Sequence, residues 1–357
     1  MSEKIHRIAV IAGDGIGKEV VPAAQSVIDA IGRAFGFRCE WSDFDWSCEV
    51  YADTGSMTGG ASIEALAEFN AVFLGAVGYP GVPDHVSLWG LLIPIRRRFE
   101  QYVNLRPVRL LPGVRTPLAD RKPNDIDFVI VRENNEGEYS EIGGRLYEGT
   151  SRELVVQQSV FTRVGVDRIL RYAFELARSR PKKHLTSATK SNGIIHSMPY
   201  WDERFAQMAS LYPDVRTDQF HIDILSAHLV QHPDWFDTIV ASNLFGDILS
   251  DLGPALAGSI GLAPGANLNP EREHPSMFEP VHGSAPDIAG KGVANPIAQI
   301  LTGAMMLEQL EEHAGAVALV SAVERVMAAG EPRTGDLGGK AGTVEMADAV
   351  IAALELE

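Results

Sequence analysis

The chain has 357 residues, of which 45% are hydrophobic, and a formal net charge of -16 at pH 7. At roughly 150 residues per domain, this length predicts two domains with a sizeable core. The acidic balance argues against nucleic acid or an anionic membrane surface as the main partner, so an acidic substrate would need a local basic cluster or a metal ion.

The two cysteines, Cys39 and Cys48, have neither the spacing of a zinc site nor that of a disulfide framework. The apolar run near the N-terminus is too short for a signal peptide, and no later run reaches the roughly 18 residues of a membrane span. We therefore expect a cytoplasmic protein with no membrane partner.

The first predicted elements are a strand, a glycine turn and a helix. Residues 7–12 have the pattern of a buried strand, residues 13–17 that of a tight turn, and residues 18–35 that of an amphipathic helix. The turn reads GDGIG, and Lys18 stands where the dinucleotide fingerprint GxGxxG needs its third glycine. We therefore do not predict a Rossmann fold.

Arginines gather after a second predicted strand, residues 71–75, and its Gly/Pro-rich loop. The segment SLWGLLIPIRRRF and the phrase NLRP contain Arg96 and Arg106, which are candidates for the bidentate clamps that a small dicarboxylate needs. Their spacing alone does not separate this role from a solvated basic face. For Arg97 and Arg98, the solvated face is the favoured interpretation.

The next strand, residues 127–131, runs into RENNEGEY and places Arg132 and Tyr139 at its carboxyl end. Ligands bind at such ends in open α/β sheets. Tyr139 is a candidate proton donor, and amphipathic packing is an equally good interpretation of it. Residues 139–162 have the pattern of short strands separated by turns, which predicts a protruding hairpin arm.

Lys190 follows the predicted strand 185–188, and a lone lysine usually lies in solvent. Asp223 is flanked by apolar residues, which makes it harder to explain as a surface charge. Asp247 and Asp251 lie four residues apart, after a strand at 238–241, on a predicted helix at 244–252. They share one helix face, where their repulsion is relieved if a hard cation such as Mg²⁺ or Mn²⁺ lies between them. A lone DxxxD pair is usually a solvated face, but this segment is too apolar for a surface helix.

The most specific stretch is residues 278–296, FEPVHGSAPDIAGKGVANP. Its glycines could bring backbone N–H groups to a pyrophosphate, while Asp287 takes the ribose hydroxyls. A carboxylate there repels a 2′-phosphate and favours NAD over NADP. From composition alone, a purely structural loop fits equally well.

In this order, NLRP, RENNEGEY, TKSNG, NLFGDILSD and FEPVHGSAPDIAGKGVANP resemble the metal-dependent β-decarboxylating hydroxyacid dehydrogenases, the family of isopropylmalate and isocitrate dehydrogenases. The resemblance covers nearly the whole chain. It implies an α/β fold of two domains that share one mixed sheet and is not a Rossmann fold. Residues 1–102 and 255–357 would form a large domain with the NAD loop. Residues 103–254 would form a small domain with the dimer interface, the hairpin arm and the metal ligands.

The resemblance also implies roles for individual residues and a homodimer with shared active sites, in which Lys190 and Asp223 come from the neighbouring subunit. It implies NAD and Mn²⁺ or Mg²⁺ as cofactors and admits a monovalent cation such as potassium. The implied acid–base and catalytic residues are Tyr139, Lys190 and Asp223, the metal ligands Asp223, Asp247 and Asp251, the substrate-binding residues Leu92, Arg96, Arg106 and Arg132, and the cofactor-binding residues Glu279, His282, Gly283, Ser284, Asp287 and Asn295.

The implied activity is NAD-dependent oxidation of small 2-hydroxy dicarboxylic acids, with β-decarboxylation where the substrate allows it. Tartrate and D-malate, the latter giving pyruvate and CO₂, are the favoured substrates, because the bulky Trp89 is expected to shrink the pocket. The alternative is 3-isopropylmalate, whose branched alkyl group Leu91 and Leu92 could receive. A non-catalytic regulatory relative is a further alternative, but such a chain would be expected to have lost an acid–base or ligand position, and this one retains them all.

Overall fold

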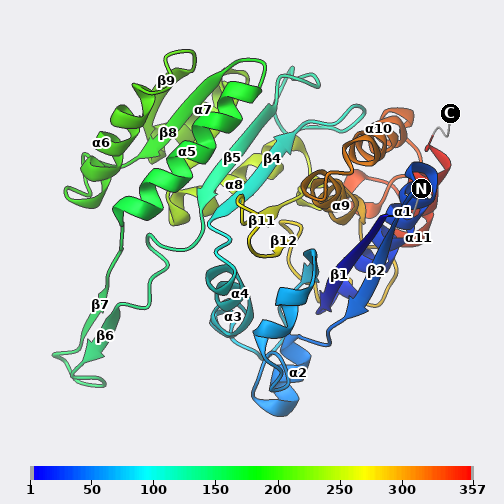
Figure 1. The fold of residues 1–357 in the computed structure, drawn as a ribbon, viewed down its shortest axis with the longest axis horizontal. Coiled ribbons are helices and arrows are strands. Elements are labelled where there is room, and N and C mark those ends of the chain that lie inside the picture. The colour runs from blue at the N-terminus through cyan, green and yellow to red at the C-terminus, as the bar shows by residue number, and fades with distance from the viewer. Residues whose placement is uncertain (1–3, 355–357) are drawn as a thin grey trace.

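The computed structural model describes residues 4–354. One ten-stranded sheet in the order β2-β1-β3-β12-β11-β4-β5-β10-β8-β9 runs through the molecule, with helices packed against it (Figure 1). Along β1, Ile8 and Val10 pack into one apolar cluster while Ala9 and Ile11 pack into another. Both faces of the strand are therefore covered, as expected for a parallel α/β sheet.

The elements agree with the strands and helices predicted from hydrophobic periodicity, and most extend them by a few residues. The strands of the large sheet are β1 (Lys4–Gly13), β2 (Phe37–Asp43), β3 (Ala71–Ala76), β4 (Val103–Arg109), β5 (Asp127–Glu133), β8 (His184–Thr189), β9 (Arg216–His221), β10 (Thr238–Ala241), β11 (Ala266–Leu268) and β12 (Ser276–Phe278). The helices are α1 (Gly17–Phe35), α2 (Cys48–Thr54), α3 (Asp84–Ser87), α4 (Ile93–Arg98), α5 (Arg163–Ser179), α6 (Ser197–Ala209), α7 (Ile222–Gln231), α8 (Asn243–Ala257), α9 (Ile297–Gln309), α10 (His313–Ala329) and α11 (Thr343–Ala352).

The sheet is mixed because its centre is antiparallel. β11 runs antiparallel to both β12 and β4, and β4 runs antiparallel to β5, whereas the remaining pairs are parallel. The prediction of an α/β fold with a shared mixed sheet is confirmed. The domain boundaries stay a prediction: the 102/103 junction coincides with the start of β4, and the 254/255 junction lies in the last turn of α8.

The hairpin arm predicted for residues 139–162 is present. β6 (Gly143–Leu146) and β7 (Leu154–Gln157) pair antiparallel in a sheet of their own, which projects from the body at the lower left of Figure 1. Every residue of both strands is exposed in the single chain. An isolated two-stranded ribbon is only marginally stable in water, so the arm needs a surface to pack on.

The glycine turn before α1 is a docking point for a later loop. A Cβ atom at Gly15 would lie 2.1 Å from the carbonyl oxygen of Ser284, and Ile16 donates its backbone N–H to that same oxygen at 2.9 Å. Gly15 also has φ of +53°, which glycine adopts freely. The turn therefore holds the 278–296 loop in place. No helix in residues 4–354 combines the length and the apolar character that a membrane crossing requires.

Candidate active site

A cavity of about 210 Å³ lies between the central strands, α4 and α8, and brings all four predicted substrate-binding residues together. Its walls come from segments far apart in the sequence, which is typical of a site built at the centre of an open sheet. Of the residues predicted from the sequence, it contains Leu92, Arg96, Arg106, Arg132, Tyr139, Asp247, Glu279, His282 and Gly283.

Two of its arginines are held by a buried polar network. Arg96 donates from Nη2 to Glu279 Oε1 at 2.6 Å, and Arg106 donates from Nε to Asn104 Oδ1 at 2.8 Å. Asn267 ties the pieces together, because it donates to Glu279 Oε1 at 2.8 Å and accepts from Asn104 at 2.9 Å. The asparagines Asn104 and Asn267 were not predicted as site residues, since a polar side chain inside a strand pattern gives no signal of what it contacts.

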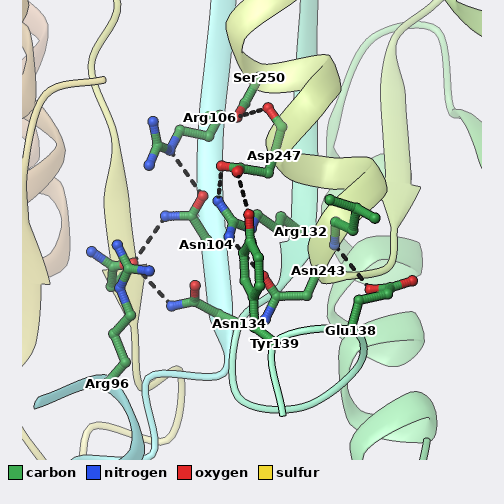
Figure 2. A network of polar contacts seen from close by, with 12 residues as sticks. Arg96, Asn104, Arg106, Arg132, Asn134, Glu138, Tyr139, Asn243, Asp247 and Ser250 are labelled. Atoms are coloured by element: carbon green, nitrogen blue, oxygen red, sulfur yellow. Dashed lines mark hydrogen bonds and ion pairs between the residues drawn. The ribbon is translucent and has the colours of Figure 1, made fainter. Parts of the chain in front are cut away.

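The third arginine, Arg132, joins the cavity to α8. Its Nε and Nη2 both donate to Asn243 Oδ1, at 3.0 and 2.6 Å, and its Nη1 pairs with Asp247 (Figure 2). The helix can approach this closely because a Cβ at Gly246 would lie 2.5 Å from that of Arg132. The glycine in NLFGD therefore sets the contact between α8 and β5.

The charge balance of the cavity is positive. Burial lowers the pKa of Arg106 to about 10 and also lowers that of Arg132, against the opposing pull of Glu279 and Asp247 respectively. Both remain cations at neutral pH. Three buried guanidinium groups, Arg96 included, thus face two carboxylates, and this surplus favours an anionic ligand.

Tyr139 and Asp247 form the contact that carries acid–base chemistry. The phenol donates to Asp247 Oδ2 at 2.7 Å, and Figure 2 shows the tyrosine reaching from its loop to the helix. Burial, together with this hydrogen bond, raises the pKa of Tyr139 to about 12, so the phenol holds its proton at neutral pH. Burial alone would raise the pKa of Asp247, but Arg132 and the phenol outweigh it and the net shift is downward.

Asp251 lies one turn after Asp247 on α8, outside the cavity lining. Burial and the neighbouring negative charge of Asp247 raise its pKa. This is the electrostatic environment that a divalent cation relieves, since hard cations take carboxylate oxygens. Asp247 and Asp251 therefore fit two of the ligand positions of a Mg²⁺ or Mn²⁺ site.

Lys190 and Asp223 lie together and do not line this cavity. Lys190 follows β8 and its Nζ donates to Asp223 Oδ1, in the first turn of α7, at 2.7 Å. The Asp223 side chain is 67% exposed. Within residues 4–354, no three His, Cys, Asp or Glu side chains are grouped to hold a metal ion, so one chain does not assemble the predicted three aspartates.

The remaining cofactor residues lie along the 278–296 loop. Ser284 and Asn295 are buried, whereas Asp287 is exposed. His282 is buried and its Nε2 has no hydrogen-bond partner among the described residues, which is the state of a group that a ligand completes. The Nε2 of His282 and the exposed carboxylate of Asp287, both on the 278–296 loop, fit a dinucleotide.

Asp336 supports that loop, and the sequence reasoning missed it. It accepts from Asn295 Nδ2 at 3.0 Å and from Ser259 Oγ at 2.6 Å. Its side chain therefore links the end of the loop to the segment after α8. The glycine-rich phrase TGDLGG, which surrounds Asp336, is the signal that could have drawn attention to it.

The interpretation of Trp89 was wrong. Leu88 and Leu92 line the cavity, but Trp89 does not; its ring instead lies under the guanidinium of Arg97, 5.3 Å from the ring centroid. Residues 88–92 form a π-helical turn, whose wider winding changes which side chains face the cavity. Leu91 is wholly buried in the core, so of the two leucines proposed to receive an alkyl group only Leu92 is available.

Comparison with known proteins agrees with this geometry. The family model described as isocitrate/isopropylmalate dehydrogenase matches residues 7–350. The chain belongs to this family. The chain is 59% identical to the D-malate dehydrogenase [decarboxylating] of Escherichia coli (strain K12), over 97% of the chain and 98% of that protein. It is 56% identical to the tartrate dehydrogenase/decarboxylase of Pseudomonas putida, over 96% of each.

Among solved structures, isocitrate dehydrogenase from Methylococcus capsulatus superposes with a TM-score of 0.87 at 35% identity, covering 98% of this chain and 99% of that one. The predicted family, the non-Rossmann fold and the assignment as a decarboxylating hydroxy acid dehydrogenase are confirmed. Dehydrogenases of this family generally use NAD and a divalent metal ion. The alternative of a non-catalytic regulatory relative is not supported.

Proposed function

We propose that this protein oxidises tartrate and D-malate with NAD⁺ and Mn²⁺ or Mg²⁺, and that it converts D-malate to pyruvate and CO₂. The observation that carries the proposal is the positive cavity in which three buried arginines meet Tyr139 and Asp247. Its volume of about 210 Å³ is below the usual 300–1,000 Å³ of drug-sized pockets and suits a four-carbon diacid. The names of the two relatives support the same substrates.

The arginines have the chemistry to bind both ends of such a diacid. Arg96, Arg106 and Arg132 each keep guanidinium N–H groups beyond those in the hydrogen bonds described above, because a guanidinium has five donors. They fix the substrate before reaction, so its orientation costs little in the transition state.

The cofactors are assigned to residues that fit them. Asp247 and Asp251, with Asp223 of a second copy, would hold the metal, and the 278–296 loop with His282 and Asp287 would hold the dinucleotide. When bound, the metal supplies Lewis-acid polarisation of the substrate oxygens and NAD⁺ supplies the hydride acceptor.

Two side chains of the protein move protons. Lys190 accepts the proton of the substrate hydroxyl as the C2 hydrogen leaves as hydride, which produces the 2-oxo acid. The β-carboxylate then leaves as CO₂, and its electron pair remains on the carbon skeleton as an enolate. Tyr139, which keeps its proton because its pKa is about 12, delivers that proton to C3.

A homodimer completes the site in this proposal. Lys190 and Asp223 are grouped on the surface of one chain rather than in its cavity, so a second copy is needed to bring them to Asp247. Exposed apolar side chains offer the surface for it, on the arm and on two helices: Leu146, Leu154, Val155, Val156, Ile224 and Ile248. Covering them on association removes apolar surface from water, which favours a dimer.

A substrate panel tests the proposal. D-malate, L-malate, L-tartrate, meso-tartrate, isocitrate and 3-isopropylmalate are incubated with NAD⁺ and Mn²⁺, and NADH fluorescence and CO₂ release are followed together. We expect NADH from D-malate and tartrate, with CO₂ released from D-malate in equal amount. Preferred turnover of 3-isopropylmalate, or NADH with none of the six, would overturn it.

Asp287 is expected to make the enzyme prefer NAD⁺ to NADP⁺. Its exposed carboxylate can accept hydrogen bonds from the ribose hydroxyls and repels a 2′-phosphate. Asp287→Asn keeps one of the two acceptor oxygens and loses the negative charge, so the preference for NAD⁺ over NADP⁺ should narrow by about 10-fold. Steady-state kinetics with both cofactors measure it, and an NADP⁺ preference in the wild type would show that the loop is assigned wrongly.

A further inference from the structure

The loop that presents Tyr139 is tied to the start of α8 by the residue before it. Glu138 Oε1 accepts the Ser242 hydroxyl at 2.8 Å, and Oε2 accepts the backbone N–H of Leu244 at 2.9 Å. Figure 2 shows the carboxylate beside the first turn of the helix. Ser242, the residue in the N-cap position, makes no cap of its own. The cap of α8 is therefore supplied by a distant loop.

The same loop and helix touch at further points. The Asn243 side-chain amide donates to the backbone oxygen of Glu136 at 3.0 Å, and a Cβ at Gly137 would lie 3.2 Å from the Cβ of Asn243. Asp247, three residues after Leu244 on the helix, accepts a hydrogen bond from the hydroxyl of Tyr139. One short stretch of loop and one turn of helix thus hold both halves of the acid–base contact.

We propose that Glu138 is a positioning residue, which fixes the loop of Tyr139 against the helix of Asp247 and so sets the phenol–carboxylate contact. A carboxylate at a helix N-terminus satisfies a free N–H and interacts favourably with the helix dipole. Because Glu138 and Tyr139 are adjacent, loss of that anchor frees the phenol. The consequence for turnover rests on the function proposed above, whereas the mechanical link does not.

Glu136 provides a matched control in the same loop. Its Oε1 accepts the backbone N–H of Thr162 at 2.9 Å and its Oε2 accepts the Thr162 hydroxyl at 2.8 Å, at the start of α5. It therefore has the same chemistry as Glu138 toward a different helix. No residue of α5 lines the site cavity.

The test compares Glu138→Ala, Glu136→Ala and the double variant Glu138→Ala with Ser242→Asp. The aspartate gives α8 a side-chain cap of its own but restores no link to the loop. For Glu138→Ala we expect kcat to fall about 10- to 100-fold, with the KM for NAD⁺ nearly unchanged. Hydrogen exchange should rise in peptides covering residues 137–141 and 243–251. The double variant should regain the lost Tm but not kcat, and Glu136→Ala should lose Tm while kcat stays within about threefold.

Recovery of both Tm and kcat in the double variant would overturn the proposal, because Glu138 would then be a helix cap and nothing more. An equal loss of kcat in Glu136→Ala would also overturn it. If the wild type turns over none of the proposed substrates, the proposed function fails by itself. Hydrogen exchange then still decides the inference, and unchanged exchange of residues 137–141 in Glu138→Ala rejects it.

Discussion

Asp247→Asn should abolish metal-dependent turnover, with a loss on the order of 10³-fold or more. The amide is nearly the same size and its oxygen can still accept from Tyr139, but it lacks the negative charge that a hard cation needs. Turnover is measured after exhaustive chelation and again after Mn²⁺ or Mg²⁺ is restored, and metal binding is measured by calorimetry. The wild type should lose activity on chelation and regain it when the metal ion is restored, whereas the variant should stay inactive under both conditions.

Asp251→Asn is the matched comparison, and we expect it to raise the stability of the metal-free protein. Burial and Asp247 raise the pKa of Asp251, so its ionised form is disfavoured in the native state. Ionisation of Asp251 therefore lowers the free energy of unfolding as pH rises through that raised pKa. The variant has no charge at this position, so its Tm at pH 7 should exceed that of the metal-free wild type. Mn²⁺ should raise the Tm of the wild type and leave the variant unchanged. Full turnover of chelated wild type would contradict the metal assignment.

Lys190→Met and Tyr139→Phe should damage different steps of the reaction. Lys190→Met removes the base, so hydride transfer itself should be suppressed with both D-malate and tartrate. Tyr139→Phe removes only the hydroxyl that meets Asp247, so oxidation should survive while protonation of the enolate slows by about 10² to 10⁴-fold. Pre-steady-state NADH formation separates the two, because only the tyrosine variant should retain a burst.

A site built from two chains also predicts complementation between inactive variants. Mixed dimers of Lys190→Met and Asp247→Asn chains contain one site with both defects and one with neither. Random reassociation should therefore restore about a quarter of wild-type turnover. Mixed dimers proven by mass spectrometry but inactive would show that Lys190 does not act across the interface.

The local elements were predictable because they depend on near neighbours in the chain. The apolar run at 238–241 followed by Asn243 was sufficient to place β10 and α8, and the acidic pair of α8 follows from helix geometry. The family resemblance then supplied the roles of Lys190 and Tyr139, which no spacing could supply. The residue patterns by themselves thus determined the elements and the residue types available for chemistry, and the family resemblance supplied the α/β fold with its shared mixed sheet.

The tertiary structure decided which of those residues meet. Arg96 and Glu279 are 183 positions apart, and Arg132 and Asp247 are 115 apart, so their pairing depends on how β4, β5, α4 and α8 pack around the centre of the sheet. The expectation for Trp89 also depended on the structure, because the π-helical winding of residues 88–92 sets the direction in which each side chain of that turn points. Periodicity reports which face of an element is apolar, whereas close contacts such as Glu138 with the start of α8 arise only when separate elements pack together.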